Sequence, residues 1–192
     1  MENDRIFVLA SKYRDFFSKH KFAPDEILTM FCYGWFVLKK YNIDEGCFVA
    51  SVYDDETNHR FTIKSQFPNF VFRLNAMYYL IVLDYQENTI SVYIKDKIIE
   101  TFKVKNLINY QDVREVNDNA LSLKSKDNHY VIHVGYEMEN DLPTKKLRLF
   151  NLGKATEIIS ADSIGNITFK DASNVVYSLS FNGKIKIVSK YV

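Results

Sequence analysis

The chain has 192 residues, enough for one compact domain, and its 47% hydrophobic content predicts a substantial core and excludes a disordered chain. Its formal net charge is only +1, so no overall field draws it to nucleic acid or to a membrane surface. The longest apolar run, Ile27 to Leu38, is too short to cross a bilayer, which takes about 20 residues.

Two helices are expected in the amino-terminal segment 1–42. Across residues 3–20, apolar side chains recur at the spacing of one helix face, at Ile6, Ala10, Tyr13 and Phe17. Residues 24–41 begin with Pro24, which suits the first position of a helix because the missing N–H would be unpaired there. This second helix is apolar nearly all round, so Trp35 on it is expected to be buried.

After Asn42 the period of the apolar residues changes from 3.6 to 2, which is typical of strands. Short strands separated by Asn, Asp and Gly turns continue to residue 190. They are expected at 47–53, 60–64, 70–74, 78–83, 85–95, 96–104, 113–116, 120–124, 130–136, 145–150, 156–160, 164–169, 175–181 and 185–188.

The last hairpin turns at Asn182-Gly183, where two registers compete. A three-residue loop pairs Phe181 with Ile185 and Leu179 with Ile187, and it keeps apolar side chains on one face. We therefore expect this register, with Gly183 in the left-handed region.

The predicted fold class is α+β and predominantly antiparallel β. Two helices in 1–42 pack on a β-meander covering 47–190, and the meander forms a barrel, a sandwich or a partial-propeller-like arrangement. The whole chain, 1–192, is expected to be a single domain.

No motif of known chemistry is present, so neither an enzyme, a metal site nor a cofactor is expected. His129 and His133 have the spacing of a metal pair on a helix, but on a strand they lie roughly 13 Å apart. Asp54, Asp55 and Glu56 lack the pattern of a calcium loop. Cys32 and Cys47 are too few for a disulfide framework and are predicted to be free thiols.

Binding of single-stranded nucleic acid is an alternative, because two strands mix cations with aromatic rings. The side chains concerned are Lys145, Lys146, Arg148 and Phe150 in one strand, and Lys184, Lys186, Lys190 and Tyr191 in the other. The balanced charge and the scarcity of Arg argue against this function.

The favoured function is a non-enzymatic protein-binding module, because 13 Tyr suit an interface. By analogy of size, we expect a cytoplasmic antagonist that neutralises one protein partner, as immunity proteins and phage or viral inhibitors do. A regulatory or assembly subunit is the next alternative. Recognition is expected at two acidic loops, through Asp54, Asp55 and Glu56 in one and Glu137, Glu139 and Asp141 in the other.

Overall fold

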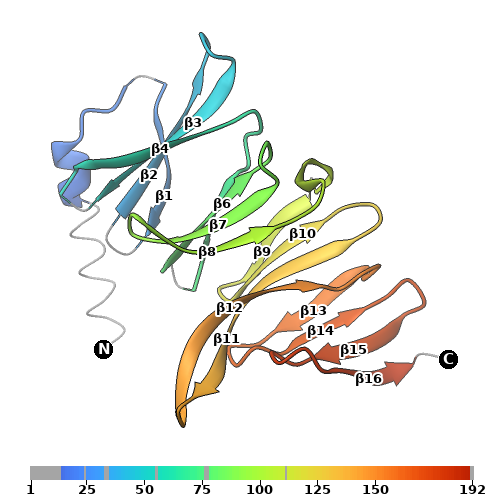
Figure 1. Cartoon of the computed structure of the whole chain (residues 1–192). Helices are drawn as coiled ribbons and strands as arrows, with labels where there is room; N and C mark the ends of the chain where they lie inside the picture. Colours follow the sequence, from blue (N-terminus) through green and yellow to red (C-terminus); the bar gives the residue numbers. More distant parts are fainter. Residues whose placement is uncertain are drawn as a thin grey trace. The chain divides into compact units, whose positions relative to one another are not determined.

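The computed structural model describes residues 14–23, 25–32, 35–54, 56–75, 78–110 and 112–190. These residues are mostly antiparallel β-structure, and sixteen strands form four sheets of four strands each (Figure 1). Within this part of the chain only residues 14–19 are α-helical, and Leu107–Asn109 adds one short 3-10 helix.

Each sheet is a meander in which consecutive strands are neighbours, the strand order of one blade of a β-propeller. The first two sheets contain β1 (Ile27–Cys32), β2 (Trp35–Asn42), β3 (Cys47–Asp54) and β4 (His59–Ser65), then β5 (Val71–Leu74), β6 (Tyr79–Asp84), β7 (Thr89–Ile94) and β8 (Lys97–Lys103). The other two contain β9 (Asp112–Asn117), β10 (Ala120–Lys124), β11 (His129–Glu139) and β12 (Leu142–Asn151), then β13 (Glu157–Ala161), β14 (Ile167–Lys170), β15 (Val175–Leu179) and β16 (Ile185–Lys190).

The chain divides into two compact units, residues 1–101 and 102–192. We call them the first and the second unit and describe each by itself. The single domain expected from the sequence stays a prediction.

The prediction of two amino-terminal helices packed on a meander is wrong. Residues 24–41 do not form a helix, because β1 and β2 occupy most of that range and pair with each other. Of the predicted helix 3–20, residues 3–13 lie outside the described part of the chain, and 14–19 are helical. The α+β class with helices packed on a meander is therefore replaced by a nearly all-β architecture.

β2 explains the error, since residues 35–38 are buried one after another. A strand covered on both faces has no polar alternation, so its apolar run has the same appearance as a buried helix. The aromatic and β-branched residues Trp35, Phe36 and Val37 favour the strand, because such side chains fit a pleated surface.

The burial of Trp35, predicted from the sequence, is confirmed: the side chain is 2% exposed. It is the only tryptophan, so its fluorescence reports on β2 alone. We expect a blue-shifted emission that iodide quenches poorly and that shifts to the red on unfolding. Red-shifted, readily quenched emission from the folded chain would contradict this position.

In the first unit, the short helix covers aromatic side chains of the first sheet. Phe16 stacks on Phe36 of β2 with ring centroids 3.9 Å apart. Tyr53 of β3 also contacts the ring of Phe16, in an edge-to-face arrangement. The two sheets of this unit also meet, because Phe61 of β4 stacks on Tyr93 of β7 at 5.0 Å. This helix thus contributes to an aromatic cluster.

In the second unit, the β9–β12 sheet and the β13–β16 sheet pack face to face. Their shared core contains Ala120, Val131, Ile167, Phe169 and Leu179. A side-chain bond also joins the two sheets, because the amide nitrogen of Asn117 donates to the carbonyl of Ala161 at 2.6 Å.

Candidate functional site

The most distinctive surface feature is the far end of the β11–β12 hairpin. β10 pairs with β11 only as far as His133, which faces Ala120. Beyond that point β11 and β12 remain paired with each other through Glu139 and Leu142. Residues 135–146, which we call the distal hairpin, therefore continue as a two-stranded ribbon past the ends of β9 and β10 (Figure 1).

The turn of the distal hairpin is short. Asn140 and Asp141 both have positive φ, 50° and 63°, as in the two-residue turns that match the twist of paired strands. The acidic loop expected at 137–143 is thus mostly strand, with Asp141 at the exposed turn.

Two predicted binding carboxylates of this hairpin already have partners within the chain. Glu137 forms an ion pair with Arg148, and Glu139 lies 2.7 Å from the ammonium of Lys146. The bond from Glu139 raises the pKa of Lys146. Both pairs are partly exposed, so each contributes little to stability. They fix the carboxylates on one face of the ribbon.

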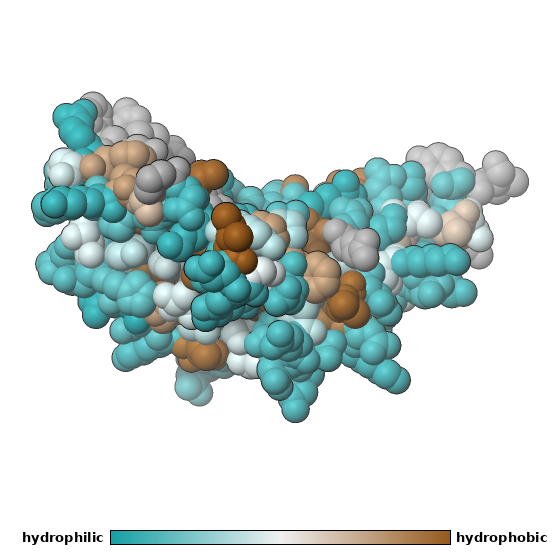
Figure 2. All heavy atoms as spheres, turned by 90° about the horizontal axis from the view of Figure 1, so that it is seen from above, coloured by the Kyte–Doolittle hydropathy of each residue, from teal (hydrophilic) through white to brown (hydrophobic). Residues whose placement is uncertain are grey.

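Apolar side chains are exposed on the same ribbon. Met138 and Leu142 are each 68% exposed and Tyr136 is 43% exposed. Because side chains alternate along a strand, Tyr136 and Met138 share the face opposite to Glu137 and Glu139. Figure 2 shows that one face of the molecule is mostly hydrophilic, with apolar residues in separate patches.

The two edges of the distal hairpin differ. β12 is an edge strand and carries Pro143, whose missing N–H prevents regular pairing there. On the edge of β11 away from β12, no strand in the described part of the chain pairs beyond His133, and residues 135–139 contain neither Pro nor Lys. Of the devices that usually protect an edge, this stretch of β11 has only the charged side chains of Glu137 and Glu139.

The other predicted acidic loop is held by its own bonds. Asp54 accepts hydrogen bonds from the backbone N–H of Glu56 and Asn58, at 3.0 and 2.8 Å, and pairs with Arg60 at 2.7 Å. Burial raises the pKa of Asp54, but these bonds and the charge of Arg60 outweigh it, so the pKa lies below its ordinary value. Glu56 is exposed, and Asp55 lies outside the described residues.

The basic strands do not gather into a stacking platform. Lys146 and Arg148 are in the ion pairs above, and Phe150 packs against the core between the sheets. Lys184 and Lys186 are exposed, whereas the side chain of Lys190 and all of Tyr191 lie outside the described part of the chain.

A serine and a histidine in the second unit have the geometry of a nucleophile and its base. His129 Nδ1 lies 3.1 Å from the carbonyl of Ala155, so it carries the proton, and Nε2 accepts from the Ser122 hydroxyl at 2.7 Å. Both side chains are only 1% exposed, between the two sheets. Since no substrate reaches them, this pair links the sheets and is not a catalytic site.

His133 has a similar structural role, because its Nε2–H donates to the carbonyl of Asp162 at 2.9 Å. Burial lowers the pKa of both His129 and His133. The sequence analysis treated these two as ordinary strand histidines. Their separation by four residues, already noted in the sequence, also places both on the face toward the β13–β16 sheet.

Two further observations concern described residues only. No group of three or more His, Cys, Asp or Glu side chains is placed to hold a metal ion. Cys47 is a buried free thiol, while the side chain of Cys32 is not among those that the structure describes.

A second apolar surface lies in the first unit. A groove of about 570 Å³ is lined by Asp25, Ile27, Lys39, Lys40, Tyr41, Ile43 and Phe48. Ile27, Tyr41 and Ile43 are exposed along it, so it resembles the distal hairpin in chemistry. Ile27 lies on β1, which is an edge strand of its sheet.

Comparisons with known proteins do not indicate a function. No family model matches the chain, and no curated protein matches its sequence. Among the described residues, no helix has the length and apolar character required to span a membrane.

Proposed function

We propose that this chain is a non-enzymatic protein-binding module that contacts one protein partner through the distal hairpin. The observation that carries the proposal is the ribbon itself, which exposes Tyr136, Met138 and Leu142 and leaves one edge of β11 without a paired strand among the described residues. A two-stranded ribbon alone is only marginally stable in water. A partner that covers it removes apolar surface from water and stabilises it.

The partner we propose is an extended segment of another protein that adds a strand beside β11. Strand addition draws affinity from backbone hydrogen bonds and specificity from alternate side chains. Apolar residues of the segment would meet Tyr136 and Met138 on one face. On the other face, Glu137 and Glu139 favour Lys or Arg between those apolar positions.

This proposal keeps part of the acidic surface expected from the sequence and changes its role. Glu137 and Glu139 border the contact, while the exposed apolar residues Tyr136 and Met138 on the opposite face supply most of the affinity. That binding neutralises the partner stays a prediction, and it is tested by assaying the activity of the partner once it is identified.

The test begins with affinity capture by the full chain and identification of proteins that bind in a saturable way. Binding is then measured with the purified partner. Replacing both Tyr136 and Met138 with Ser should weaken it at least about tenfold, since burying one such side chain contributes about 1.5–3 kcal/mol. Ile164→Ser is the matched control, because Ile164 is exposed to a similar degree, 63%, in a turn of the same unit.

Charge reversal tests the border of the contact. With Glu137 and Glu139 both changed to Lys, we expect slower association and a weaker dependence on salt. Circular dichroism checks that all variants fold. A partner that binds the double Ser variant and the wild type equally would contradict the proposed surface, and the groove of the first unit would then be tested through Ile43→Ser.

A further inference from the structure

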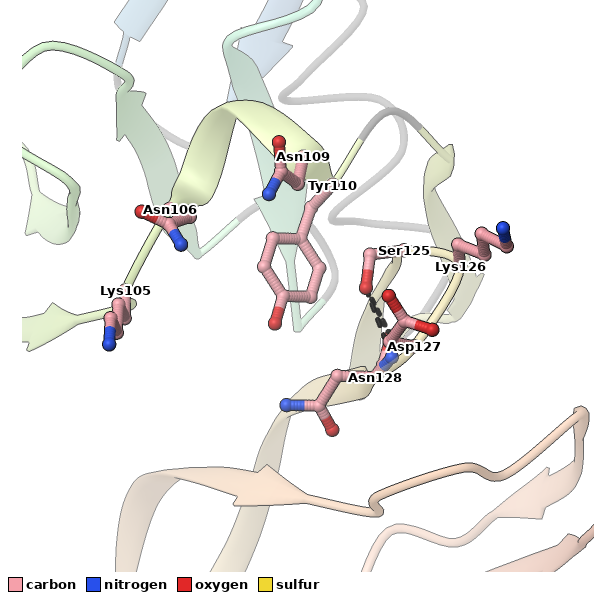
Figure 3. Close-up of a pocket in the computed structure, with 8 residues that line it drawn as sticks. All are labelled: Lys105, Asn106, Asn109, Tyr110, Ser125, Lys126, Asp127 and Asn128. Atoms are coloured by element: carbon pink, nitrogen blue, oxygen red, sulfur yellow. Dashed lines mark hydrogen bonds between the residues drawn. The ribbon is translucent and has the colours of Figure 1, made fainter.

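A cavity of about 420 Å³ lies in the second unit between two turns (Figure 3). One turn, at 105–110, follows β8, and the other, at 125–128, joins β10 to β11. The lining residues are Lys105, Asn106, Asn109, Tyr110, Ser125, Lys126, Asp127 and Asn128. This volume is within the range of small-molecule sites, about 300–1,000 Å³.

Both turns are fixed by their own hydrogen bonds. Ser125 N–H donates to the carbonyl of Asn128 at 2.9 Å, and the Ser125 hydroxyl accepts from the N–H of Asn128 at 3.0 Å. In the other turn, the N–H of Asn109 donates to the carbonyl of Asn106 at 2.9 Å. The walls are therefore formed before a ligand arrives, which reduces the entropic cost of binding.

Tyr110 forms a rigid wall of this cavity. It is only 5% exposed, and its ring lies 5.4 Å from that of Tyr130. Figure 3 shows its hydroxyl directed toward the space between Asn106 and Asn128. Burial raises the pKa of Tyr110, so the hydroxyl remains a neutral donor.

The lining is rich in donors and contains two cations. Figure 3 shows Lys105 and Lys126 on opposite sides of the other lining residues, with the side chain of Lys126 extending away from Tyr110. Asn106 and Asn128 turn their side chains toward the space between them. Asn106 has φ 55°, a left-handed conformation that Asn tolerates better than most residues. Ammonium and amide donors in such an arrangement suit an anionic group.

Asp127 adds an acceptor to this set of donors. Its carboxylate has no ion-pair partner among the described residues and would repel a bare anion near it. A ligand that meets both requirements has a negative group at one end and hydroxyls that donate to the carboxylate at the other. We propose that this cavity binds a small phosphorylated polyol, such as a sugar phosphate, with its phosphate near Lys105 and Asn106 and its hydroxyls near Asp127.

The experiment is a calorimetric titration of the full chain with glucose 6-phosphate, with glucose and with inorganic phosphate. We expect the sugar phosphate to bind at least about tenfold more tightly than either part alone, because only it engages both ends. Absence of saturable binding by the sugar phosphate at millimolar concentration would overturn the proposal, and so would equal affinity for inorganic phosphate.

Variants locate the site. Lys105→Ala combined with Lys126→Ala should weaken binding of glucose 6-phosphate at least about tenfold. The matched control pair is Lys154→Ala with Lys184→Ala, two exposed lysines elsewhere in the same unit. Equal weakening by both pairs would mean that binding is non-specific attraction, which overturns the assignment.

Two single substitutions distinguish the ends of the ligand. Asn106→Gly keeps the left-handed backbone and removes the amide, so it should weaken both the sugar phosphate and inorganic phosphate. Asp127→Asn should weaken the sugar phosphate but not inorganic phosphate. If Asp127→Asn leaves the preference for the sugar phosphate unchanged, the polyol assignment is wrong.

Discussion

Gly165→Ala is expected to destabilise the second unit by about 3–5 kcal/mol, the sum of overpacking and backbone strain. A Cβ at this position would lie 2.5 Å from Cβ of Phe181 and 2.6 Å from its Cγ, and Gly165 has φ +112°. The atoms it would meet are the near end of the ring, which cannot move without the backbone. Equilibrium unfolding in urea measures the loss.

Two other glycines separate the cost of overpacking from the cost of backbone strain. Gly135 has no positive φ, but its Cβ would lie 2.5 Å from Cδ2 of Phe181, so Gly135→Ala should cost about 1–3 kcal/mol from overpacking alone. Gly183 has φ +87° with nothing within 4 Å, so Gly183→Ala should cost only about 1 kcal/mol.

A double-mutant cycle completes this test. With Phe181 already changed to Ala, the added cost of Gly165→Ala should fall only in part, because the contacts with Cγ and Cδ2 are gone while the 2.5 Å contact with Cβ and the backbone strain remain. If Gly165→Ala costs no more than Gly183→Ala in the wild-type background, the seat of Phe181 between Gly135 and Gly165 is wrong.

The same phenylalanine explains why the last hairpin was mispredicted. Leu179 pairs with Ile185, two residues from the expected partner Ile187, although Gly183 does have the expected positive φ. Phe181 leaves the strand ladder and packs in the core, 5% exposed, where its ring meets that of Phe150. The contact lies on another sheet, so the local apolar pattern around the turn could not indicate it.

Strands with local signals were predictable. The three expected between 78 and 104 correspond to β6, β7 and β8, because Asn and Asp mark the turns and the apolar residues alternate in β7. Residues 85–88, expected within the strand 85–95, instead form the turn before β7, and Asn88 there has φ 56°, which Asn tolerates. β2 failed for the opposite reason: it is buried on both faces and shows no alternation.

The distal hairpin could be predicted only in part. The sequence indicates that Glu137, Glu139 and Asp141 form an acidic segment. It does not indicate that Glu137 pairs with Thr144 and Glu139 with Leu142, because this depends on the register between β11 and β12. Where β10 ends against β11 determines which residues project as a ribbon. That limit is a property of tertiary pairing, and no motif marks it.

The second unit should also lose stability as the pH falls below about 6.5, the ordinary pKa of histidine. Burial is the main cause that lowers the pKa of His129 and His133 in the folded chain. Below the ordinary value the unfolded chain binds protons that the folded chain does not, so acid favours unfolding. Stability from these groups is fully present above that pH and is lost as the pH falls toward the lowered values.

The hydrogen bonds explain why the folded unit resists protonation. His129 must stay neutral to accept a hydrogen bond from the Ser122 hydroxyl while it donates one to the carbonyl of Ala155. The charges of Lys124 and Arg114 disfavour a protonated ring, whereas the charge of Asp112 favours it. For His133, burial is the main cause that lowers the pKa, while the charge of Asp162 and the backbone carbonyls of Asp162 and Gly165 partly favour the protonated ring. Each histidine can contribute a slope of at most about 1.4 kcal/mol per pH unit.

Urea unfolding between pH 8 and pH 5 measures this slope. His133→Gln keeps a donor for the carbonyl of Asp162 but cannot titrate, so the slope below about pH 6.5 should become shallower by up to one proton. His59→Gln, at an exposed position of β4, is the matched control for loss of a histidine. If stability stays level down to pH 5, or if the two variants change the slope equally, the buried histidines are not the cause of the acid sensitivity.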